Sequence, residues 1–490
     1  MTTTPPGGQL RSPGLTLLTA SCGTLLVLID YTSPLTTLSP TAAALHIGVS
    51  AQTWVLTGTL VGLAALLLTA GSAADDYGRK RVFGGGAVLL LVSTVLSAAA
   101  PNTGLFLTGR VLQGCAAAAI LAPTLGLISN VYPVGPTRIR ALGMWGASVG
   151  LGIALGPVYA ALMERAGGWR SVYWVLALLS AGLVLLTALG LDESKNERPR
   201  KLDPLGVLAL ASGSSCLIAG LSEGRHGWGR GIVIGLLAVG VVLLIAFALV
   251  ESRVSEPMLD LALFRNPGFI ASSSGALFTG LSIVGLMSYL PTVLQKSLGE
   301  TPLAASGVLA IWSGLSVVSA LQARRLVNRM AATTQVSASL LICGLGEAAL
   351  YGLHAGGSWD HLAPGLIVAG IGSGVLNAAL ARLAVSSVPP HRAAMGSGAN
   401  NSARYLGSAL GVAVTATVVS QAKSDAGPAH AMADGANNAV LVAAAICVLG
   451  AAIALWARTA EARAARVAAA SEPVLQTEAT QTAAPLRSAS

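Results

Sequence analysis

Long apolar runs alternate with short polar segments along almost the whole of this 490-residue chain. Fourteen of the runs are long enough to be membrane-spanning helices, since about 20 apolar residues cross a bilayer. They are residues 14–34, 54–74, 82–100, 105–131, 141–163, 170–191, 205–222, 230–250, 269–292, 304–323, 334–353, 362–386, 402–421 and 437–457. The pattern predicts an all-α integral membrane protein with fourteen transmembrane helices. We expect residues 458–490, which are rich in Ala, Ser, Thr and Glu, to form a disordered tail.

The composition agrees with this class of protein. Hydrophobic residues make up 53% and charged residues 10% of the chain, whereas about 25% of the residues in soluble domains are charged. A net charge of +9 would suggest a nucleic-acid partner for a soluble protein. Here 20 of the 29 Lys and Arg fall on one side of the membrane when both termini are placed in the cytoplasm. Because cytoplasmic loops carry an excess of Lys and Arg, we expect a multi-pass protein in a lipid bilayer, with both termini cytoplasmic and no nucleic-acid partner.

The sequence contains no pattern typical of a cofactor or of catalysis. His354 and His361 have no cysteine nearby, and the cysteines lack the short spacings of disulfide frameworks and zinc sites. We therefore expect no metal and no cofactor. The phosphate-binding motif G-x-x-x-x-G-K-[ST] is absent, as are H-E-x-x-H and G-x-S-x-G. We predict that the chain is not an enzyme, and a polytopic membrane enzyme is only a remote alternative.

Three ionisable residues inside apolar runs are our candidates for proton and substrate coupling, namely Asp30, Arg110 and Glu347. A charged side chain at the bilayer centre costs about 2.5–3.5 kcal/mol on insertion scales, so it usually faces a partner or a water-filled cavity. A carboxyl group at Asp30 can take a proton from one side and release it to the other. The structural alternatives stay open: Asp30 solvated at the outer interface, Arg110 in a plain ion pair, and Glu347 at the lipid edge with a local partner.

The segment Gly71-Ser-Ala-Ala-Asp75-Asp-Tyr-Gly78-Arg79-Lys80-Arg81 lies at the turn between two apolar runs. Its glycines permit a tight turn and close helix approach, and its carboxylate and cations can form pairs that differ between two conformations. We expect a cytoplasmic gate that comprises Gly71, Asp75, Gly78, Arg79, Lys80 and Arg81. The alternative is that the cations only anchor this loop on the cytoplasmic side.

Further motifs follow in order along the chain. They are Arg110-Val-Leu-Gln113-Gly114, then Gly146-x-x-x-Gly150-x-Gly152-x-x-x-Gly156-Pro157, then Leu202-Asp203-Pro-Leu-Gly206, then Glu256-Pro257-Met258-Leu259-Asp260, and finally Gly398-Ala-Asn400-Asn401-x-x-Arg404. Glycines at such spacings allow membrane helices to pack closely.

In this order and spacing the motifs resemble those of the major facilitator superfamily, and in particular its fourteen-helix drug:proton antiporters, which include quaternary-ammonium and antibiotic exporters. The loop 71–81 is similar to G-x-x-x-D-x-x-G-R-K-x, and Arg110 stands where that family has R-x-x-Q-G. The glycine motif ending at Pro157 departs from the family, since a glycine pair usually follows where this chain has Val158-Tyr159-Ala160-Ala161. The similarity runs from about residue 30 to about residue 413.

The resemblance implies a major facilitator fold, with one six-helix bundle in residues 14–191, a linker with two inserted helices in residues 192–268, and a second bundle in residues 269–457. It implies a monomer that exports small amphipathic molecules, such as drugs or antibiotics, across the cell membrane by alternating access in exchange for protons. The remaining motif residues would serve packing or gating: the helix-5 antiporter motif (Gly146, Gly150, Gly152, Gly156 and Pro157) and the helix-13 motif (Asn400 and Arg404). A proton-coupled importer of a small metabolite on the same fold is the alternative.

Overall fold

The computed structural model describes residues 12–196, 203–224, 227–254, 257–327 and 329–482. Every regular element within these ranges is helical. The first half contains α1 (Pro13–Thr32), α2 (Pro34–Ala44), α3 (Val49–Tyr77), α4 (Arg79–Ala99), α5 (Thr103–Val131), α6 (Pro136–Gly167), α7 (Trp169–Gly190), α8 (Pro204–Gly224) and α9 (Gly231–Glu251).

The second half continues with helices of unequal length. It contains η1 (Leu261–Arg265), α10 (Pro267–Phe278), the π-helical turn η2 (Thr279–Val284), α11 (Gly285–Ser297), α12 (Pro302–Gln322), α13 (Arg324–Val327), α14 (Ala332–Ala348), η3 (Trp359–Leu362), α15 (Ala363–Ser386), η4 (Pro390–Arg392), α16 (Ala393–Gln421) and α17 (Pro428–Thr482). Four of these helices (α12, α15, α16 and α17) have more than 20 residues.

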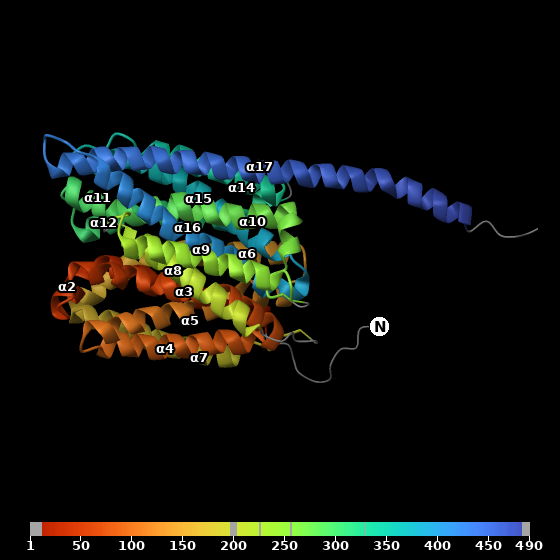
Figure 1. The fold of residues 1–490 in the computed structure, drawn as a ribbon, viewed down its shortest axis with the longest axis horizontal. Coiled ribbons are helices and arrows are strands. Elements are labelled where there is room, and N and C mark those ends of the chain that lie inside the picture. Colours follow the sequence, from red (N-terminus) through yellow and green to blue (C-terminus); the bar gives the residue numbers. More distant parts are fainter. Residues whose placement is uncertain (1–11, 197–202, 225–226, 255–256, 328, 483–490) are drawn as a thin grey trace, which may run out of the picture.

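The helices lie roughly along one direction and form two halves that pack against each other (Figure 1). In one half α1, α3, α4, α5, α6 and α7 pack on one another, and in the other α10, η2, α11, α12, α14, α15, α16 and α17 do so. Between the halves, α6 packs on α12 and α15, while α16 packs on α3 and α5. Helix α8 contacts both α3 and α16, and α9 packs on the outer side of α8.

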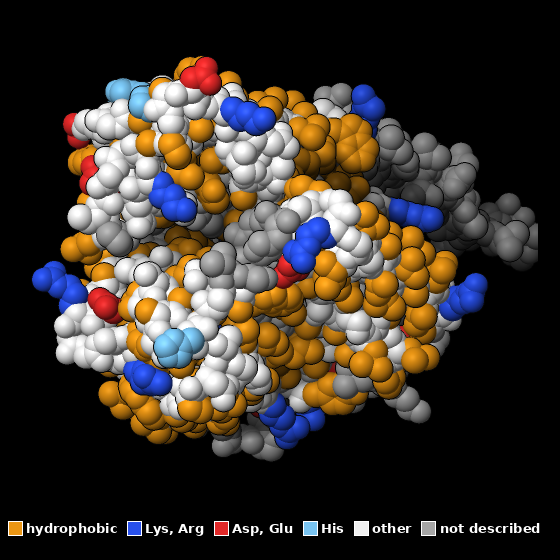
Figure 2. All heavy atoms as spheres, turned by 60° about the vertical axis from the view of Figure 1, so that its left-hand side comes forward, with side chains coloured by type: hydrophobic (Ala, Val, Ile, Leu, Met, Phe, Trp, Pro, Cys, Tyr) orange, Lys and Arg blue, Asp and Glu red, His pale blue; other side chains and the backbone are white. Residues whose placement is uncertain are grey.

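Thirteen helices of the described part of the chain are long and apolar enough to cross a membrane. The remaining expected run corresponds to α14, whose 17 residues are the lower limit for a spanning helix. Each of the fourteen expected runs therefore overlaps a helix, and the prediction of an all-α membrane protein is confirmed. Hydrophobic side chains cover much of the flank, and charged ones are scattered singly on it (Figure 2).

Several predicted boundaries were wrong. The chain stays helical past Pro34, because Ser33 keeps helical dihedral angles and its N–H still bonds to Ile29 O, so α2 continues α1 after a proline break. Helix α16 begins at Ala393 rather than near residue 402. The expected disordered tail is helical as far as Thr482, as a continuation of α17, and its many Ala, Arg and Glu are strong helix formers. Residues 483–490 lie outside the described ranges.

Glycines allow α3 and α5 to approach each other closely in the first half. A Cβ on Gly114 of α5 would lie 2.9 Å from Leu63 N on α3 and still closer to Thr59 O. A Cβ on Gly62 of α3 would likewise lie 2.7 Å from Cys115 N. The backbones of α3 and α5 therefore come so close that there is no room for a side chain at Gly62 or Gly114. This contact positions Arg110, which lies one turn before Gly114.

We expect Gly114→Ala to lower the stability of the protein by about 1–3 kcal/mol, because the added methyl group must push the two backbones apart. Gly85→Ala in α4 is the matched control. A Cβ on Gly85 meets no atom within 4 Å, and alanine favours a helix by about 0.8–1.0 kcal/mol over glycine. Thermal unfolding of the purified variants in detergent, followed by circular dichroism, measures both. Equal unfolding temperatures for the two variants would contradict the close contact.

Candidate functional site

The carboxylate of Asp75 joins the two halves at one end of the molecule. It is fully buried and accepts hydrogen bonds from Arg79 Nη2 at 2.7 Å and Arg79 Nε at 2.9 Å. It also accepts from Ala394 N at 3.1 Å and Met395 N at 2.8 Å. These two amides belong to the first turn of α16, where the helix dipole favours negative charge. One carboxylate thus binds its own half and caps a helix of the other half.

The other residues of the predicted gate divide into two groups. Gly71 lies against α16, where a Cβ would stand 2.6 Å from Ala394 O, and Arg79 Nη1 donates to Gly126 O at 3.3 Å. Lys80 and Arg81 instead contact the segment after α7. Lys80 Nζ donates to Leu191 O at 2.7 Å, and Arg81 Nε lies 3.7 Å from Glu193 Oε2.

Gly78 makes the turn between α3 and α4. Its φ of 126° is one that favours glycine, and a Cβ there would lie 2.6 Å from Glu193 Oε1. The structure therefore brings Gly71, Asp75 and Arg79 together at the junction with the second half. Gly78, Lys80 and Arg81 instead contact the segment that follows α7. Sequence reasoning missed Glu193 and the amides of α16, because backbone amides leave no signal in the residue types.

Asp30 and Arg110 form a buried ion pair within the first half. Arg110 Nη1 lies 3.3 Å from Asp30 Oδ2 and donates to Gln113 Oε1 at 2.6 Å. Arg110 Nε donates to Val55 O at 3.2 Å. Asp30 is 2% exposed and Arg110 is 0% exposed. The structure thus joins two of the three predicted coupling residues and rules out the alternative in which Asp30 is solvated at the interface.

This pair keeps unused bonding capacity. Asp30 Oδ1, Arg110 Nη2 and Gln113 Nε2 are buried without a partner among the described residues. Buried polar atoms are nearly always hydrogen-bonded, so the cluster can accept a further proton or reorganise its bonds. Asp30 of this cluster is followed on α1 by Tyr31 and Thr32, which line a cavity.

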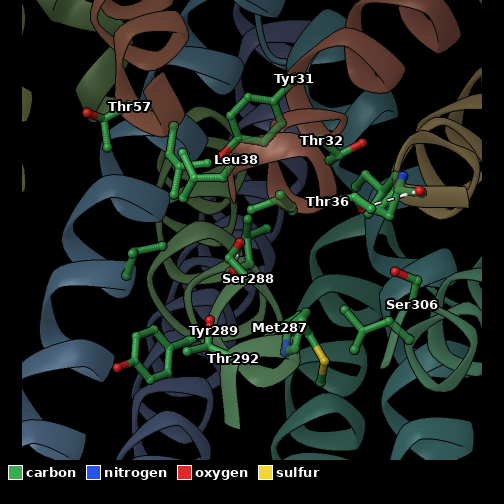
Figure 3. Close-up of a pocket in the computed structure, with 18 of the residues that line it drawn as sticks. Tyr31, Thr32, Thr36, Leu38, Thr57, Met287, Ser288, Tyr289, Thr292 and Ser306 are labelled. Carbon is green, nitrogen blue, oxygen red and sulfur yellow. Dashed lines mark hydrogen bonds between the residues drawn. The ribbon is translucent and has the colours of Figure 1, made fainter. Parts of the chain in front are cut away.

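The cavity has a volume of about 220 Å³ and lies between the two halves, away from Asp75. Residues from α1, α2, α3, α6 and α8 line it on one side and residues from η2, α11, α12 and α16 on the other. In Figure 3, Tyr31, Thr32 and Thr36 face Met287, Ser288 and Thr292 across it. Thr36 Oγ1 donates to Pro157 O at 3.3 Å, which ties α2 to α6 at the wall.

The wall of the cavity is neutral and amphipathic. None of its described lining residues is charged. The apolar part comes mainly from leucines and from the aromatic residues Tyr31, Tyr289 and Trp312, and the polar part from Gln295 and hydroxyl groups. The serine and threonine residues of the wall are Thr32, Thr36, Thr57, Ser222, Ser288, Thr292, Ser306 and Ser313. Such a surface suits an organic molecule with apolar and hydrogen-bonding parts.

The helix-5 glycines lie in α6 and face both halves. A Cβ on Gly152 would lie 2.7 Å from Leu28 Cβ of α1, and one on Gly156 would collide with Thr32. A Cβ on Gly150 would lie 3.3 Å from Val317 of α12, and Gly146 faces Ala378 of α15 at 3.6 Å. Pro157 lines the cavity. The motif therefore lets α6 pack closely on α1 while it also contacts α12 and α15.

Three predicted residues lie within the second half, apart from the Asp30 pair. Arg404 Nη1 donates to Asn377 Oδ1 at 2.9 Å, and Asn400 Nδ2 donates to Ser272 O at 3.0 Å. Both bonds tie α16 to its own half, in agreement with a packing role. Glu347 lies in α14 and is 0% exposed, so it is not at the lipid edge. It does not line the cavity.

A model of the family described as Major Facilitator Superfamily matches residues 20–412. The chain belongs to this superfamily. It is 33% identical to the puromycin resistance protein pur8 of Streptomyces alboniger, over 80% of this chain and 79% of that protein. It is 29% identical to the multidrug resistance protein Stp of Mycobacterium tuberculosis (strain CDC 1551 / Oshkosh), over 84% and 76% of the two chains.

A solved structure shares the fold of this major facilitator superfamily protein. The crystal structure of the human organic anion transporter MFSD10 (TETRAN) superposes with a TM-score of 0.64 at 18% identity, covering 92% of this chain and 100% of that one. The resemblance inferred from the motifs is thus confirmed for the superfamily and the fold, and the relatives carry the names of drug-resistance proteins.

In this superfamily protein we expect Asp75→Asn to release the first turn of α16. Hydrogen bonds to charged groups contribute about 1.5–3 kcal/mol, so the amides of Ala394 and Met395 should exchange hydrogen for deuterium about ten- to hundredfold faster. Mass spectrometry of the protein in nanodiscs measures this exchange. Asp76→Asn is the matched control, because Asp76 Oδ1 accepts from Asn196 within the first half, at 2.9 Å. Equal exchange in both variants would show that Asp75 does not hold α16.

Proposed function

We propose that this protein exports small amphipathic compounds, antibiotics or other drugs among them, in exchange for protons. The observation that carries the proposal is the neutral, hydroxyl-rich cavity between the halves, next to the buried Asp30–Arg110 pair and sealed from the opposite end by Asp75. Sealing at one end and a cavity toward the other is the arrangement that alternating access requires.

The choice of drugs as substrates rests on the relatives and on the wall of the cavity. Two relatives that align over most of this chain are named as puromycin and multidrug resistance proteins. An uncharged wall with many hydroxyls suits amphipathic molecules of different shapes, because it has no fixed charge that a neutral molecule would have to desolvate. A transporter for one small polar metabolite would be expected to present more specific polar contacts.

Proton coupling follows from the chemistry of the Asp30 pair. An ionised Asp30 is stabilised by Arg110 at 3.3 Å, and a proton on Asp30 would weaken that attraction. Arg110 would still keep Gln113 Oε1 and Val55 O as acceptors. Taking up or losing a proton at Asp30 would therefore change how firmly α1 and α5 are held together, beside the cavity residues Tyr31 and Thr32.

The direction and the location of transport are part of the proposal. With both termini in the cytoplasm, as the distribution of Lys and Arg favours, the Asp75 junction lies on the cytoplasmic side and the cavity faces outward. We propose a monomer in the bacterial cell membrane. We divide it into a first bundle in residues 14–191, a linker with the inserted helices α8 and α9 in residues 192–268, and a second bundle in residues 269–457.

We expect the native protein in everted membrane vesicles to release protons when a substrate is added, and Asp30→Asn to abolish this response. The asparagine keeps the shape of the side chain but cannot carry a proton. A pH-quenched dye reports the gradient after respiration has formed it, and puromycin, ethidium and tetraphenylphosphonium are then added in turn. Asp425→Asn, at an exposed loop position, is the control and should behave as the native protein.

Two outcomes would contradict the proposal in different ways. An equal response from the native protein and Asp30→Asn would remove Asp30 from the coupling path. No response to any compound would remove the main support for export, and accumulation of labelled metabolites in whole cells would then test import.

A further inference from the structure

Glu347 is a second carboxylate buried inside the membrane part of the molecule. It lies in the middle of the second half, where α14 packs on α15, α17, α10 and η2. Ser282 Oγ of η2 lies 2.7 Å from Glu347 Oε2, and Glu347 Oε1 has no partner among the described residues. Unlike Asp30, this carboxylate is not beside an arginine.

The groups that face Glu347 are nearly all neutral. From α17 it meets Cys447, whose Sγ lies 3.3 Å from Ser282 Oγ, and on its own helix Cys343 stands one turn away. From α15, Ser373 contacts Cys343. Across the described ranges, no Lys, Arg or His forms an ion pair with Glu347. An ionised carboxylate in such surroundings would be strongly destabilised.

The hydrogen bonds of Ser282 give an independent indication of a proton. Ser282 Oγ lies 2.7 Å from Glu347 Oε2 and also 2.7 Å from Ala443 O, and both are positioned to accept. A serine hydroxyl has a single hydrogen to donate. Both short distances are satisfied when Glu347 is protonated and donates to Ser282, while Ser282 donates to Ala443 O. With Glu347 ionised, one of these two oxygen pairs would have no hydrogen between them.

We propose that Glu347 is a proton-binding site of the second half, occupied in the conformation described here, and distinct from the Asp30 pair of the first half. This deepens the proton coupling proposed above, and it depends on that function only for the role of the site in transport. The proton would reside between Glu347 and Ser282 and would leave to water when that contact opens.

The site is connected to the cavity through the helix that carries Ser282. Helix α10 passes into the π-helical turn η2 and then into α11, so Val284, Met287 and Ser288 of the same helix line the cavity. π-Helical turns are rare and frequently lie at functional sites. Gly280 and Gly285 press this turn against α16: a Cβ on Gly285 would lie 2.6 Å from Gly411 C, and one on Gly280 would overlap Arg404 O.

This arrangement explains how the loss of a proton from Glu347 could change the shape of the cavity. An ionised Glu347 would need water or another donor, and η2 is the element that would have to move to admit it. Movement of η2 would shift Met287 and Ser288 at the wall. The protonation state of Glu347 would then change the cavity wall through η2 and α11. That of Asp30 would act through α1.

The experiment that tests the site does not require a substrate. The infrared spectrum of the purified full chain in nanodiscs, at neutral pH, contains the carbonyl stretching band of any protonated carboxylic acid. We expect Glu347→Gln to remove such a band from the native spectrum, whereas Asp30→Asn leaves that band in place. The glutamine keeps the size of the side chain and can still donate to Ser282, so the fold should persist. Identical native and Glu347→Gln spectra would overturn the proposal.

Ser282→Ala tests the same site without touching the carboxyl group. The alanine removes the acceptor of the proton, so the band should remain and move to higher frequency as its hydrogen bond weakens. An unchanged frequency would show that the proton does not point at Ser282 and would overturn the proposed geometry. This variant also keeps the test valid if Glu347→Gln fails to fold.

The role in transport is tested separately in proteoliposomes with ethidium. If Glu347 takes part in coupling, Glu347→Gln should lower the number of protons exchanged per ethidium molecule relative to the native protein. An unchanged ratio, together with a lost infrared band, would overturn the coupling role but not the proton site. If the native protein does not move ethidium or any other probe, the proposed function fails, while the infrared result still decides whether Glu347 holds a proton.

Discussion

The hydrocarbon interior of a membrane provides no partner for a charge, and this constraint determines how the polar groups of the structure are arranged. Each buried ionisable group must be paired, neutralised or brought to water. Asp75 is paired with Arg79 and with helix amides, Asp30 is paired with Arg110, and Glu347 forms no ion pair with any residue that the structure describes. These three solutions differ in how easily they can be undone, which is why we propose a different role for each: a latch at Asp75, proton coupling at Asp30 and proton storage at Glu347.

The contacts between the two halves are suited to being broken and remade. At the Asp75 end they include two hydrogen bonds from amides of the first turn of α16 to one carboxylate. Along α6 the halves meet through small residues, as at Gly150, where an added Cβ would lie 3.4 Å from Ser313 O. Small residues allow close contact without interlocking side chains, so one half can tilt against the other without repacking its own interior.

Much of the fold could be predicted from the sequence, because every membrane-spanning helix needs its own run of apolar residues. Helix ends are less accessible: the apolar pattern predicts an end at Pro34, although helical dihedral angles continue through Ser33 into α2. That Arg110 pairs with a carboxylate could be anticipated from its charge, but its partner, Asp30, could not be chosen from the sequence. The partners of Asp75 on α16 could not be predicted, because they are backbone amides, which any residue type provides. The hydroxyls around the cavity could not be predicted either, because many Ser and Thr in these helices instead bond to the backbone of their own helix.

The cavity wall is uncharged, and the buried ionisable groups lie outside it, so a substrate and a proton would bind at different residues. Since no lining residue among those described is charged, the wall distinguishes molecules by shape and by hydroxyl contacts rather than by a matching charge. The ionisable groups stand behind the wall, Asp30 next to Tyr31 on α1 and Glu347 against the turn that leads into α11. A substrate can therefore influence them only by moving the helices that it touches. In the proposed exchange, this arrangement would let the same proton-binding residues serve molecules of different charge, because none of them would need to bind a carboxylate directly.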